Sequence, residues 1–324
     1  MNTEKLGEKN LFDTFDRIFK KHTEPLIEEY IGEEKEARSL LYTIKAGRNR
    51  FRSGLPFLLL ENNKLGTIVG AISEISWAAI LILDDIGDKT YIRRGKKSAW
   101  AKFGLLEASH AAALGFLMSE EIIKDNLARN KALLSSFRRA LKLTLIAQIE
   151  QGNVYPKSKL ANLILNNYIG KTSLGRWPLE ASLILDYALD SSEKTKLDLF
   201  IREISVVAQI KNDLEDFGIG FFDEKYEPTM KDLEGKTVSY PIALFFSMAL
   251  ERERELFIKN YWGRKMKEDG TKKVISILNK YKVFDICIGE IENRLCRARL
   301  LIKGTNPKYR KTLGSWAREY KIII

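Results

Sequence analysis

The chain contains little cysteine and little histidine. Its 324 residues include two cysteines, Cys287 and Cys296, and two histidines, His22 and His110. Two cysteines provide neither a disulfide framework nor a zinc-binding pattern, and so few histidines argue against a His-based catalytic triad. This composition suits a reducing compartment, and we expect a cytoplasmic protein.

Long apolar runs and strand patterns are also missing. No apolar run reaches 18 residues without a charge, so we expect no transmembrane helix, and the first ten residues, MNTEKLGEKN, lack the apolar core of a signal peptide. Prolines number seven, and apolar residues recur mostly at i, i+3 and i+4. We therefore expect an all-α fold, in which residues 1–324 form a single domain, one large bundle of ten or more helices around a central apolar cavity.

The spacing of apolar residues and the turn residues between them give the expected boundaries. Residues 218–235 are rich in Gly, Asp and Lys and are expected to form a lid, and the chain ends in the apolar tail Ile322–Ile324. Lys/Arg-rich helices are expected towards the end of the chain, after an apolar helix that follows residue 241. The earlier expected helices cover residues 9–31, 34–47, 55–61, 66–90, 97–118, 130–151, 157–170, 174–189 and 193–217, the last beginning at Ser191-Ser192-Glu193.

The charge balance is basic. There are 54 Lys and Arg residues against 43 Asp and Glu, which gives a net charge of +11. The basic residues are spread along the chain, which is typical of a solvated surface but also suits an anionic substrate or peripheral contact with an anionic membrane. No RNA- or DNA-binding motif is present, and we expect no nucleic-acid partner.

Three carboxylates end the most apolar stretch, EISWAAILILDDIGDKTYIRRG, which begins at Glu74. On a helix, Asp84 and Asp88 lie one turn apart on the same face, with Asp85 beside them. Two carboxylates about 4 Å apart repel by roughly 4 kcal/mol at an effective dielectric near 20, and Mg²⁺ is a suitable ion to offset this. The alternative is a solvated acidic helix end.

A second acidic cluster has the same spacing. Asn212, Asp213 and Asp216 occupy positions i, i+1 and i+4, and two such helix ends facing each other would hold several Mg²⁺ ions against a polyphosphate. Each nearby cation taken alone is explained by a position on the surface. Taken together, the cations would neutralise the phosphate charge that the Mg²⁺ ions leave. These cations are Arg93, Arg94, Lys171 and Lys236.

Six short motifs occur along the chain: AGRNRFRS, DDIGD, RRGKKS, GKTSL, AQIKNDLED and GKTVSYPIAL. Their order is that found in the trans-isoprenyl diphosphate synthases, the polyprenyl synthetase family, and the chain resembles that family over roughly residues 40–245. The resemblance implies an isoprenoid-synthase fold, a homodimer, three Mg²⁺ ions and ionisation of an allylic prenyl diphosphate of C15–C20 or longer, which isopentenyl diphosphate then attacks.

The resemblance also implies roles for individual residues. The metal ligands would be Asp84, Asp85, Asp88, Asp213 and Asp216, with the carbonyl oxygen of Asn212 replacing the usual Asp. Lys171 and Gln209 would act at the allylic diphosphate, which Arg93 and Lys236 would also grip. The second diphosphate would face Arg94, Arg52 and Arg50.

Several departures from the family pattern concern the isopentenyl diphosphate site. Asn49 replaces a Lys and Trp77 replaces a His, while Leu83 and Ala208 replace a His and a Phe elsewhere. Hydrogen bonds to charged groups contribute about 1.5–3 kcal/mol each, so two losses weaken that site considerably. Trp77 would either stabilise a carbocation or pack in the core. The small Ala79 suggests an open cavity floor and long products.

Four functions fit these observations. We slightly favour a class I terpene synthase, because the ionisation residues are kept while the acceptor site has lost its Lys and His. The alternatives are a chain-elongating trans-prenyltransferase that makes geranylgeranyl or a longer diphosphate, with arginines 48, 50 and 52 compensating, and prenyl transfer to another acceptor. A non-catalytic partner subunit is disfavoured because the acidic ligand positions are retained.

Overall fold

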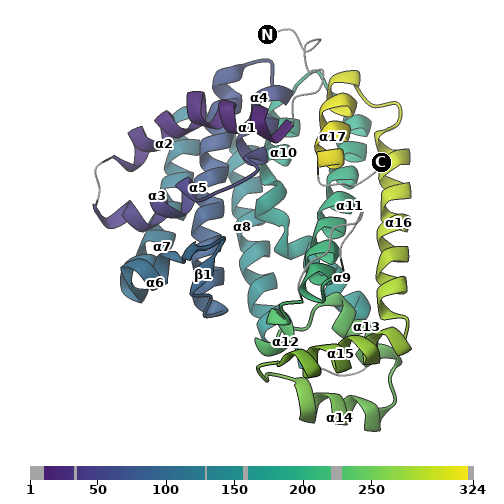
Figure 1. Cartoon of the computed structure of the whole chain (residues 1–324). Coiled ribbons are helices and arrows are strands. Elements are labelled where there is room, and N and C mark those ends of the chain that lie inside the picture. The colour runs from purple at the N-terminus through teal and green to yellow at the C-terminus, as the bar shows by residue number, and fades with distance from the viewer. Residues whose placement is uncertain (1–10, 33–34, 128–129, 156–159, 220–227, 320–324) are drawn as a thin grey trace. The chain divides into compact units, whose positions relative to one another are not determined.

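The structure is a computed structural model that describes residues 11–32, 35–127, 130–155, 160–219 and 228–319. Most of the described chain is α-helical (Figure 1), which confirms the predicted all-α class. Its contacts divide the chain into two compact units. The predicted single domain and central apolar cavity stay predictions. Unit 1 comprises Met1–Leu141, Leu174–Asp198 and Gly304–Glu319, and unit 2 comprises Lys142–Ser173, Leu199–Lys303 and Tyr320–Ile324.

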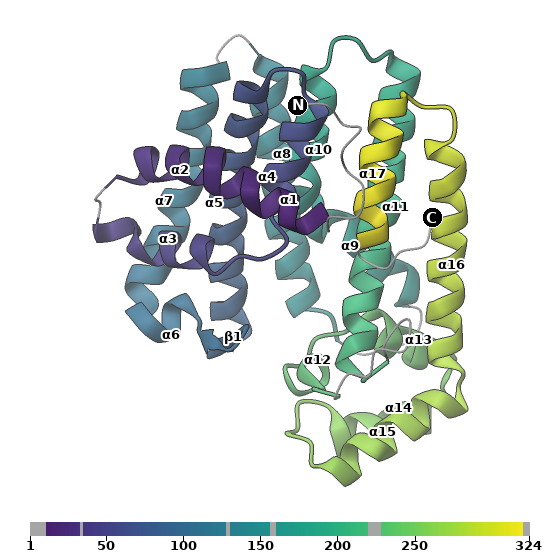
Figure 2. The same ribbon diagram turned by 45° about the horizontal axis from the view of Figure 1, so that its top comes forward.

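Unit 1 is organised around a long apolar helix, α5 (Asn63–Gly87), which packs most extensively against α4 and α7 (Figures 1 and 2). Helices α8 and α11 each contribute their first part to this unit. Its elements besides α5 are α1 (Leu11–Ile18), η2 (Phe19–Thr23), α2 (Glu24–Ile31), η3 (Lys35–Ala37), α3 (Arg38–Lys45), α4 (Phe51–Leu59), β1 (Ile92–Arg93), β2 (Lys96–Lys97), α6 (Ala99–Phe103), α7 (Leu105–Leu127), the start of α8 (Lys131–Gly152), α10 (Ser173–Leu185), the start of α11 (Ser191–Asp216) and α17 (Pro307–Glu319).

Helix α5 is a core helix. Asn62 caps its start, because the Asn62 Oδ1 accepts hydrogen bonds from the backbone N–H groups of Lys64 and Leu65 at 3.0 and 3.3 Å. The helix is long and apolar enough to cross a membrane, but 78% of its most apolar window is buried inside the protein. A Cβ on Gly66 would lie 2.6 Å from the Phe57 Cα, so glycine lets α4 approach α5 closely.

Helix α5 ends earlier than predicted, at Gly87, and a short hairpin follows. Strands β1 and β2 pair antiparallel, which the sequence analysis missed because two-residue strands show no alternation. Arg94 and Gly95 connect them with φ angles of 53° and 77°, the two left-handed residues of a type I′ turn. The hairpin turns the chain back towards the end of α5.

Other helix boundaries differ in ways that single residues explain. The helix predicted over 97–118 is split into α6 and α7 at Gly104, whose φ is +94°. Helix α4 begins at Phe51 rather than at residue 55. The predicted start of α11 at Ser191 is confirmed, but its cap is Asp190, whose Oδ1 accepts a 2.8 Å hydrogen bond from the Glu193 N–H.

Unit 2 contains the remaining helices, and α16 runs alongside α11 in both ribbon views (Figures 1 and 2). Ion pairs join these two helices, because Glu203 of α11 accepts from Arg294 and Arg297 of α16 at 3.0 and 3.2 Å. Residues 220–227 of the predicted lid and the tail Ile322–Ile324 lie outside the described residues. The elements of unit 2 are the rest of α8 and α11, α9 (Ala161–Lys171), α12 (Lys231–Glu234), α13 (Tyr240–Met248), α14 (Glu251–Tyr261), α15 (Glu268–Lys280) and α16 (Val283–Ile302).

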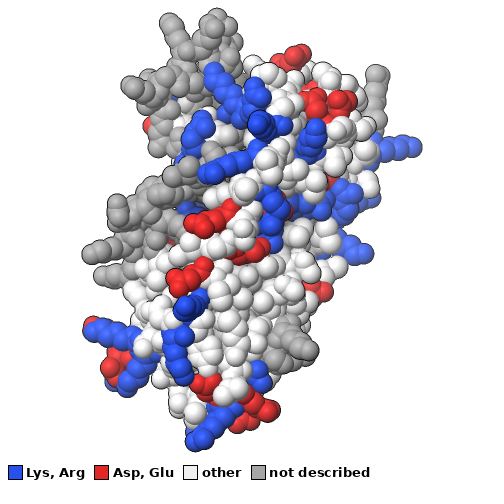
Figure 3. Space-filling model, turned by 90° about the vertical axis from the view of Figure 1, so that its right-hand side faces the viewer, with Lys and Arg blue, Asp and Glu red and all other residues white. Residues whose placement is uncertain are grey.

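Charged side chains of both signs are distributed over the face shown in Figure 3. Lys and Arg gather mainly in the upper half of that face, where Asp and Glu interrupt them. This face therefore has the mixed character of a solvated surface, and the expected absence of a nucleic-acid partner stays a prediction.

A buried ion pair holds the loop between α3 and α4 against α5. Arg50 Nη1 lies 3.0 Å from Glu74 Oε2, and both side chains are almost fully buried. Ser53 donates a 3.1 Å hydrogen bond to the other Glu74 oxygen, Arg50 Nη2 donates to the Ile44 carbonyl at 2.8 Å, and the guanidinium lies 3.6 Å from the Phe19 ring centroid. These contacts hold Arg50 at an unfavourable φ of 26°.

We predict that the ion pair between Arg50 and Glu74 contributes strongly to the free energy of unfolding. Arg50→Ala and Glu74→Ala should each lower the free energy of unfolding by about 3–5 kcal/mol, because each leaves an unpaired buried charge. Chemical denaturation should show that the double variant loses much less than the sum of the two single losses. Additive losses would mean that the two side chains contribute independently.

Candidate active site

The carboxylates at the end of α5 differ in their surroundings. The Asp85 side chain is 3% exposed and the Asp84 side chain is 27% exposed. Asp88 follows the last helical residue and is exposed, and its N–H still donates to the Asp84 carbonyl at 2.9 Å. Asp84 and Asp88 therefore keep the one-turn spacing that the sequence predicted.

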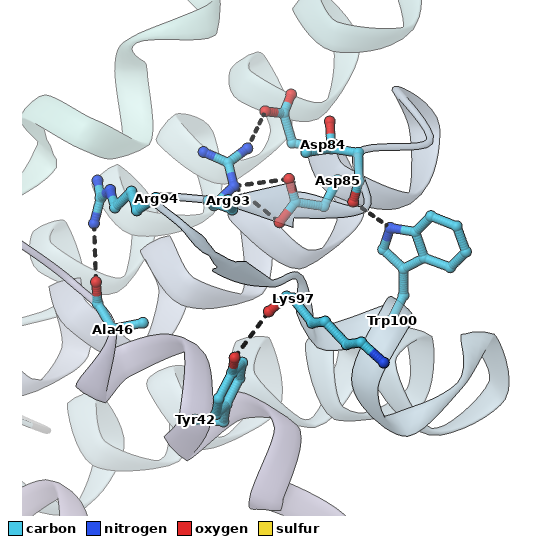
Figure 4. A network of polar contacts seen from close by, with 9 residues as sticks. Tyr42, Ala46, Asp84, Asp85, Arg93, Arg94, Lys97 and Trp100 are labelled. Atoms are coloured by element: carbon cyan, nitrogen blue, oxygen red, sulfur yellow. Dashed lines mark hydrogen bonds and ion pairs between the residues drawn. The ribbon is translucent and has the colours of Figure 1, made fainter.

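The hairpin returns Arg93 to these carboxylates, as Figure 4 shows. Arg93 Nε lies 2.7 and 2.9 Å from the two Asp85 oxygens, and Arg93 Nη2 lies 3.4 Å from Asp84 Oδ2. Two further bonds fix the hairpin: Trp100 Nε1 donates to the Thr90 carbonyl at 3.0 Å, and Tyr42 donates to the Lys97 carbonyl at 2.8 Å. Arg93 thus supplies a counter-charge for the acidic cluster, and its predicted grip on a diphosphate stays a prediction.

Burial and charge act in opposite directions on Asp85. Burial raises the pKa of its carboxyl above the ordinary value, while the adjacent Arg93 guanidinium lowers it. The carboxyl is held by Arg93 in this structure. Asp84 and Asp88 are the more accessible oxygen donors at this helix end, and hard carboxylate oxygens of this kind fit Mg²⁺.

Three arginines line a hollow next to the acidic cluster. The hollow has an empty volume of about 270 Å³ that is continuous with solvent. Arg94 Nη1 donates to the Ala46 carbonyl at 3.2 Å, and desolvation together with the neighbouring arginines lowers the pKa of Arg94. Because like charges gathered in one place repel, an anion bound here would relieve that repulsion. Its charged and aromatic lining residues are Arg48, Arg52, Glu74, Trp77 and Arg94.

Trp77 lies in this hollow as a partner of Arg52. The Arg52 Cζ lies 4.0 Å from a Trp77 ring centroid and 4.4 Å from the Phe51 ring centroid. The cation on the face of the Trp77 ring is therefore the guanidinium of Arg52. The predicted direct role of Trp77 in carbocation stabilisation stays a prediction.

Two of the residues considered from the sequence have packing roles. The guanidinium of Arg50 is committed to the buried pair with Glu74, so it is not presented to a ligand in this structure. Ala79 is fully buried, and a Cβ on Gly115 of α7 would lie 3.2 Å from the Ala79 Cβ. The small size of Ala79 thus allows close packing of α5 on α7, and its predicted effect on product length stays a prediction.

Glu74 is a residue of this site that the sequence analysis did not single out. It is the sole charged residue within the apolar part of α5, between Lys64 and Asp84. A lone carboxylate in such a helix requires a buried partner, and this was the available signal. The partner itself, Arg50, was not identifiable from spacing.

In unit 2, Asp213 is buried in a network of hydrogen bonds. One of its oxygens accepts from the Tyr168 hydroxyl and, at 2.9 Å, from the Tyr240 N–H, while the other accepts from Gln209 Nε2 at 3.2 Å. Burial raises the pKa of Asp213 to about 6, and these hydrogen bonds oppose that rise. Neither tyrosine was predicted as part of the site.

The neighbouring predicted residues are also placed in unit 2. Asp216 anchors the segment before α12, accepting from Thr229 and, at 2.9 and 3.2 Å, from the N–H groups of Lys231 and Asp232. Asn212 is exposed. Their predicted roles as metal ligands stay predictions. Among the described residues no group of three or more His, Cys, Asp and Glu side chains arranged to hold a metal ion is found.

The two predicted lysines of unit 2 are held in different ways. Lys171 lies at the end of α9 and donates a 2.8 Å hydrogen bond to Gln151 Oε1. Lys236 is exposed, follows α12 and has a φ of 61°. A Cβ on Gly263 would lie 2.2 Å from the Lys236 Cε, so the lysine stem packs on a glycine.

Comparison with known folds gives close matches over nearly the whole chain. A decaprenyl diphosphate synthase from Rhodobacter capsulatus matches with a TM-score of 0.83 and 18% identity, over 96% of this chain and 99% of that chain. A geranylgeranyl pyrophosphate synthetase from Pyrococcus horikoshii matches with a TM-score of 0.81 and 20% identity, over 96% and 98%. A polyprenyl synthase from Caulobacter crescentus, complexed with calcium and isoprenyl diphosphate, matches with a TM-score of 0.78 and 17% identity, over 97% and 98%.

These structural matches establish the fold that the sequence resemblance implied. The family is established by a match between the sequence and a family profile. A comparison with curated proteins gives no match. The family profile described as polyprenyl synthetase matches residues 33–278, which is more than half of the chain and includes both acidic clusters and the three arginines of the hollow. The chain is therefore a member of the polyprenyl synthetase family, an enzyme of the trans-prenyltransferase type.

Proposed function

We propose that this enzyme is a chain-elongating trans-prenyltransferase, which adds isopentenyl diphosphate to an allylic prenyl diphosphate. The observation that carries this proposal is the hollow lined by Arg48, Arg52 and Arg94. An enzyme that only cyclises one allylic diphosphate has no need for a second cluster of cations. The solved structures with this fold include decaprenyl, geranylgeranyl and farnesyl diphosphate synthases, and this agrees with elongation.

The proposal reverses the order of the two leading hypotheses from the sequence. Terpene synthesis was favoured because Asn49 and Trp77 replace a cationic Lys and His. In the structure, Arg48 and Arg52 line the hollow beside these positions. The hollow therefore holds three positive charges, and Arg48 adds one to the two arginines, Arg52 and Arg94, that the family resemblance already assigns to the second diphosphate.

In the proposed reaction, the C–O bond of the allylic diphosphate breaks and pyrophosphate leaves with the electron pair. The double bond of isopentenyl diphosphate forms the new C–C bond with the allylic cation, and a proton is then lost. The product is a diphosphate longer by one isoprene unit. The arginines of the hollow hold the second diphosphate, so its double bond is presented at a fixed position.

Mg²⁺ is part of this proposal. Asp84 and Asp88 would hold it at the end of α5, where it would neutralise charge on the departing pyrophosphate. We propose Asn212 and Asp216 as further oxygen donors, and Lys171, Lys236 and Gln209 as contacts of the allylic diphosphate. Homodimer formation, a cytoplasmic location and peripheral membrane contact stay predictions.

The reaction is tested by incubation with Mg²⁺ and C10, C15 or C20 allylic diphosphates, each with and without isopentenyl diphosphate. Mass spectrometry should find longer diphosphates, and only where isopentenyl diphosphate is present. A hydrocarbon or alcohol formed from one allylic diphosphate alone would instead establish a terpene synthase. The free allylic alcohol expected from slow hydrolysis is subtracted with a tube that lacks enzyme.

Arg48 should carry part of the acceptor binding that the missing Lys supplies elsewhere in the family. Arg48→Ala is expected to raise the KM for isopentenyl diphosphate about tenfold or more, because a hydrogen bond to a charged group contributes about 1.5–3 kcal/mol. The KM for the allylic diphosphate should change little. Arg310→Ala, at an exposed arginine of α17, is the matched control. An unchanged KM for isopentenyl diphosphate would remove Arg48 from the site.

Asp88 should be needed for metal-dependent turnover and not for folding, because it is exposed. Asp88→Asn is expected to lower kcat/KM by about a hundredfold or more at saturating Mg²⁺, because metal stabilisation of a leaving group contributes several kcal/mol. Thermal unfolding should be unchanged. Asp125→Asn, at an exposed acid of α7, should leave turnover intact. Full activity of the Asp88 variant would contradict the assignment.

A further inference from the structure

The side chain of Arg52 lies between two aromatic rings. Its Cζ lies 4.0 Å from a ring centroid of Trp77 on α5 and 4.4 Å from the ring centroid of Phe51 on α4. Both distances are within the range of a cation–π contact. An unbranched arginine side chain has many rotamers, so two rings that enclose its guanidinium restrict where the charge lies.

Both rings are braced by helices distant in the sequence. A Cβ on Gly175 of α10 would lie 3.1 Å from the Trp77 Cζ3, so Trp77 packs closely against the backbone of that helix. The Phe51 ring centroid lies 5.5 Å from that of Trp316, a buried residue of α17. The rings are therefore held by the packing of unit 1.

We propose that Phe51 and Trp77 form an aromatic clamp that positions Arg52 for the diphosphate of isopentenyl diphosphate. The inference rests on the proposed function, and it gives Trp77 a role as a positioning residue that acts through Arg52. Trp77 contributes no charge of its own. Its ring lies against the Arg52 guanidinium, and both residues line the hollow in which phosphate oxygens would accept hydrogen bonds from that guanidinium.

The same clamp links the acceptor site to the C-terminal helix. Trp316 contacts Phe51, Phe51 contacts Arg52, and Arg52 lines the hollow. Helix α17 thereby supports the position of a charge that is more than 250 residues earlier in the chain. A change at Trp316 should act on acceptor binding without touching the acceptor.

The test is a double-variant cycle in which the dissociation constant of isopentenyl diphosphate is measured by calorimetry. Trp77→Leu should weaken binding about tenfold, which corresponds to about 1.4 kcal/mol, within the range of a partly desolvated cation–π contact. Trp77→Phe keeps an aromatic face and should weaken binding by less than about threefold. In the Arg52→Ala background, Trp77→Leu should have no further effect.

Steady-state kinetics provide a second readout. Trp77→Leu and Trp316→Leu should raise the KM for isopentenyl diphosphate and leave the KM for the allylic diphosphate unchanged, with Trp316→Phe restoring the normal value. Equal losses for the Leu and Phe variants of Trp77, or a Trp77→Leu effect that persists in the Arg52→Ala background, would overturn the clamp alone. Absence of isopentenyl diphosphate binding by the unaltered enzyme would overturn both the clamp and the proposed function.

Discussion

Arg50 and Glu74 form a buried ion pair within the otherwise apolar packing around α5. The neighbouring site depends on this ion pair. It fixes the loop between α3 and α4 at two consecutive left-handed residues, Asn49 and Arg50. Arg48 and Arg52 lie on either side of these residues and line the hollow. The ion pair therefore fixes the backbone from which both arginine side chains extend.

Helix α5 combines the parts of the site because of its periodicity. Glu74, Trp77, Leu81, Asp84 and Asp88 are spaced three or four residues apart, and so they follow one side of the helix. Along this side the helix presents a buried anchor, an aromatic surface and then accessible carboxylates. The type I′ hairpin adds Arg93 and Arg94 at the acidic end, one bonded to carboxylates and the other lining the hollow.

The sequence predicted the helical class, most of the helices and the residues at the two acidic clusters, because these depend on local periodicity and on motif order. It did not predict the partners. Nothing in the spacing shows that Glu74 meets Arg50, that Arg52 meets Trp77, or that Asp213 accepts from Tyr168, since these contacts join segments tens of residues apart. The replacement of a Lys by Asn49 and of a His by Trp77 suggested a lost acceptor site. In the structure, neighbouring arginines line the hollow next to these positions.

The apolar character of α5 also has a consequence during synthesis. One of the two helices that cover it most, α7, is complete only at Leu127, forty residues after α5 ends. At a translation rate of about 5–20 residues per second, the nascent chain carries this hydrophobic segment without its full cover for about two to eight seconds. Quality-control factors that recognise exposed apolar helices therefore have a window in which to bind it, and the yield of folded enzyme depends on α7 docking before they or other nascent chains do.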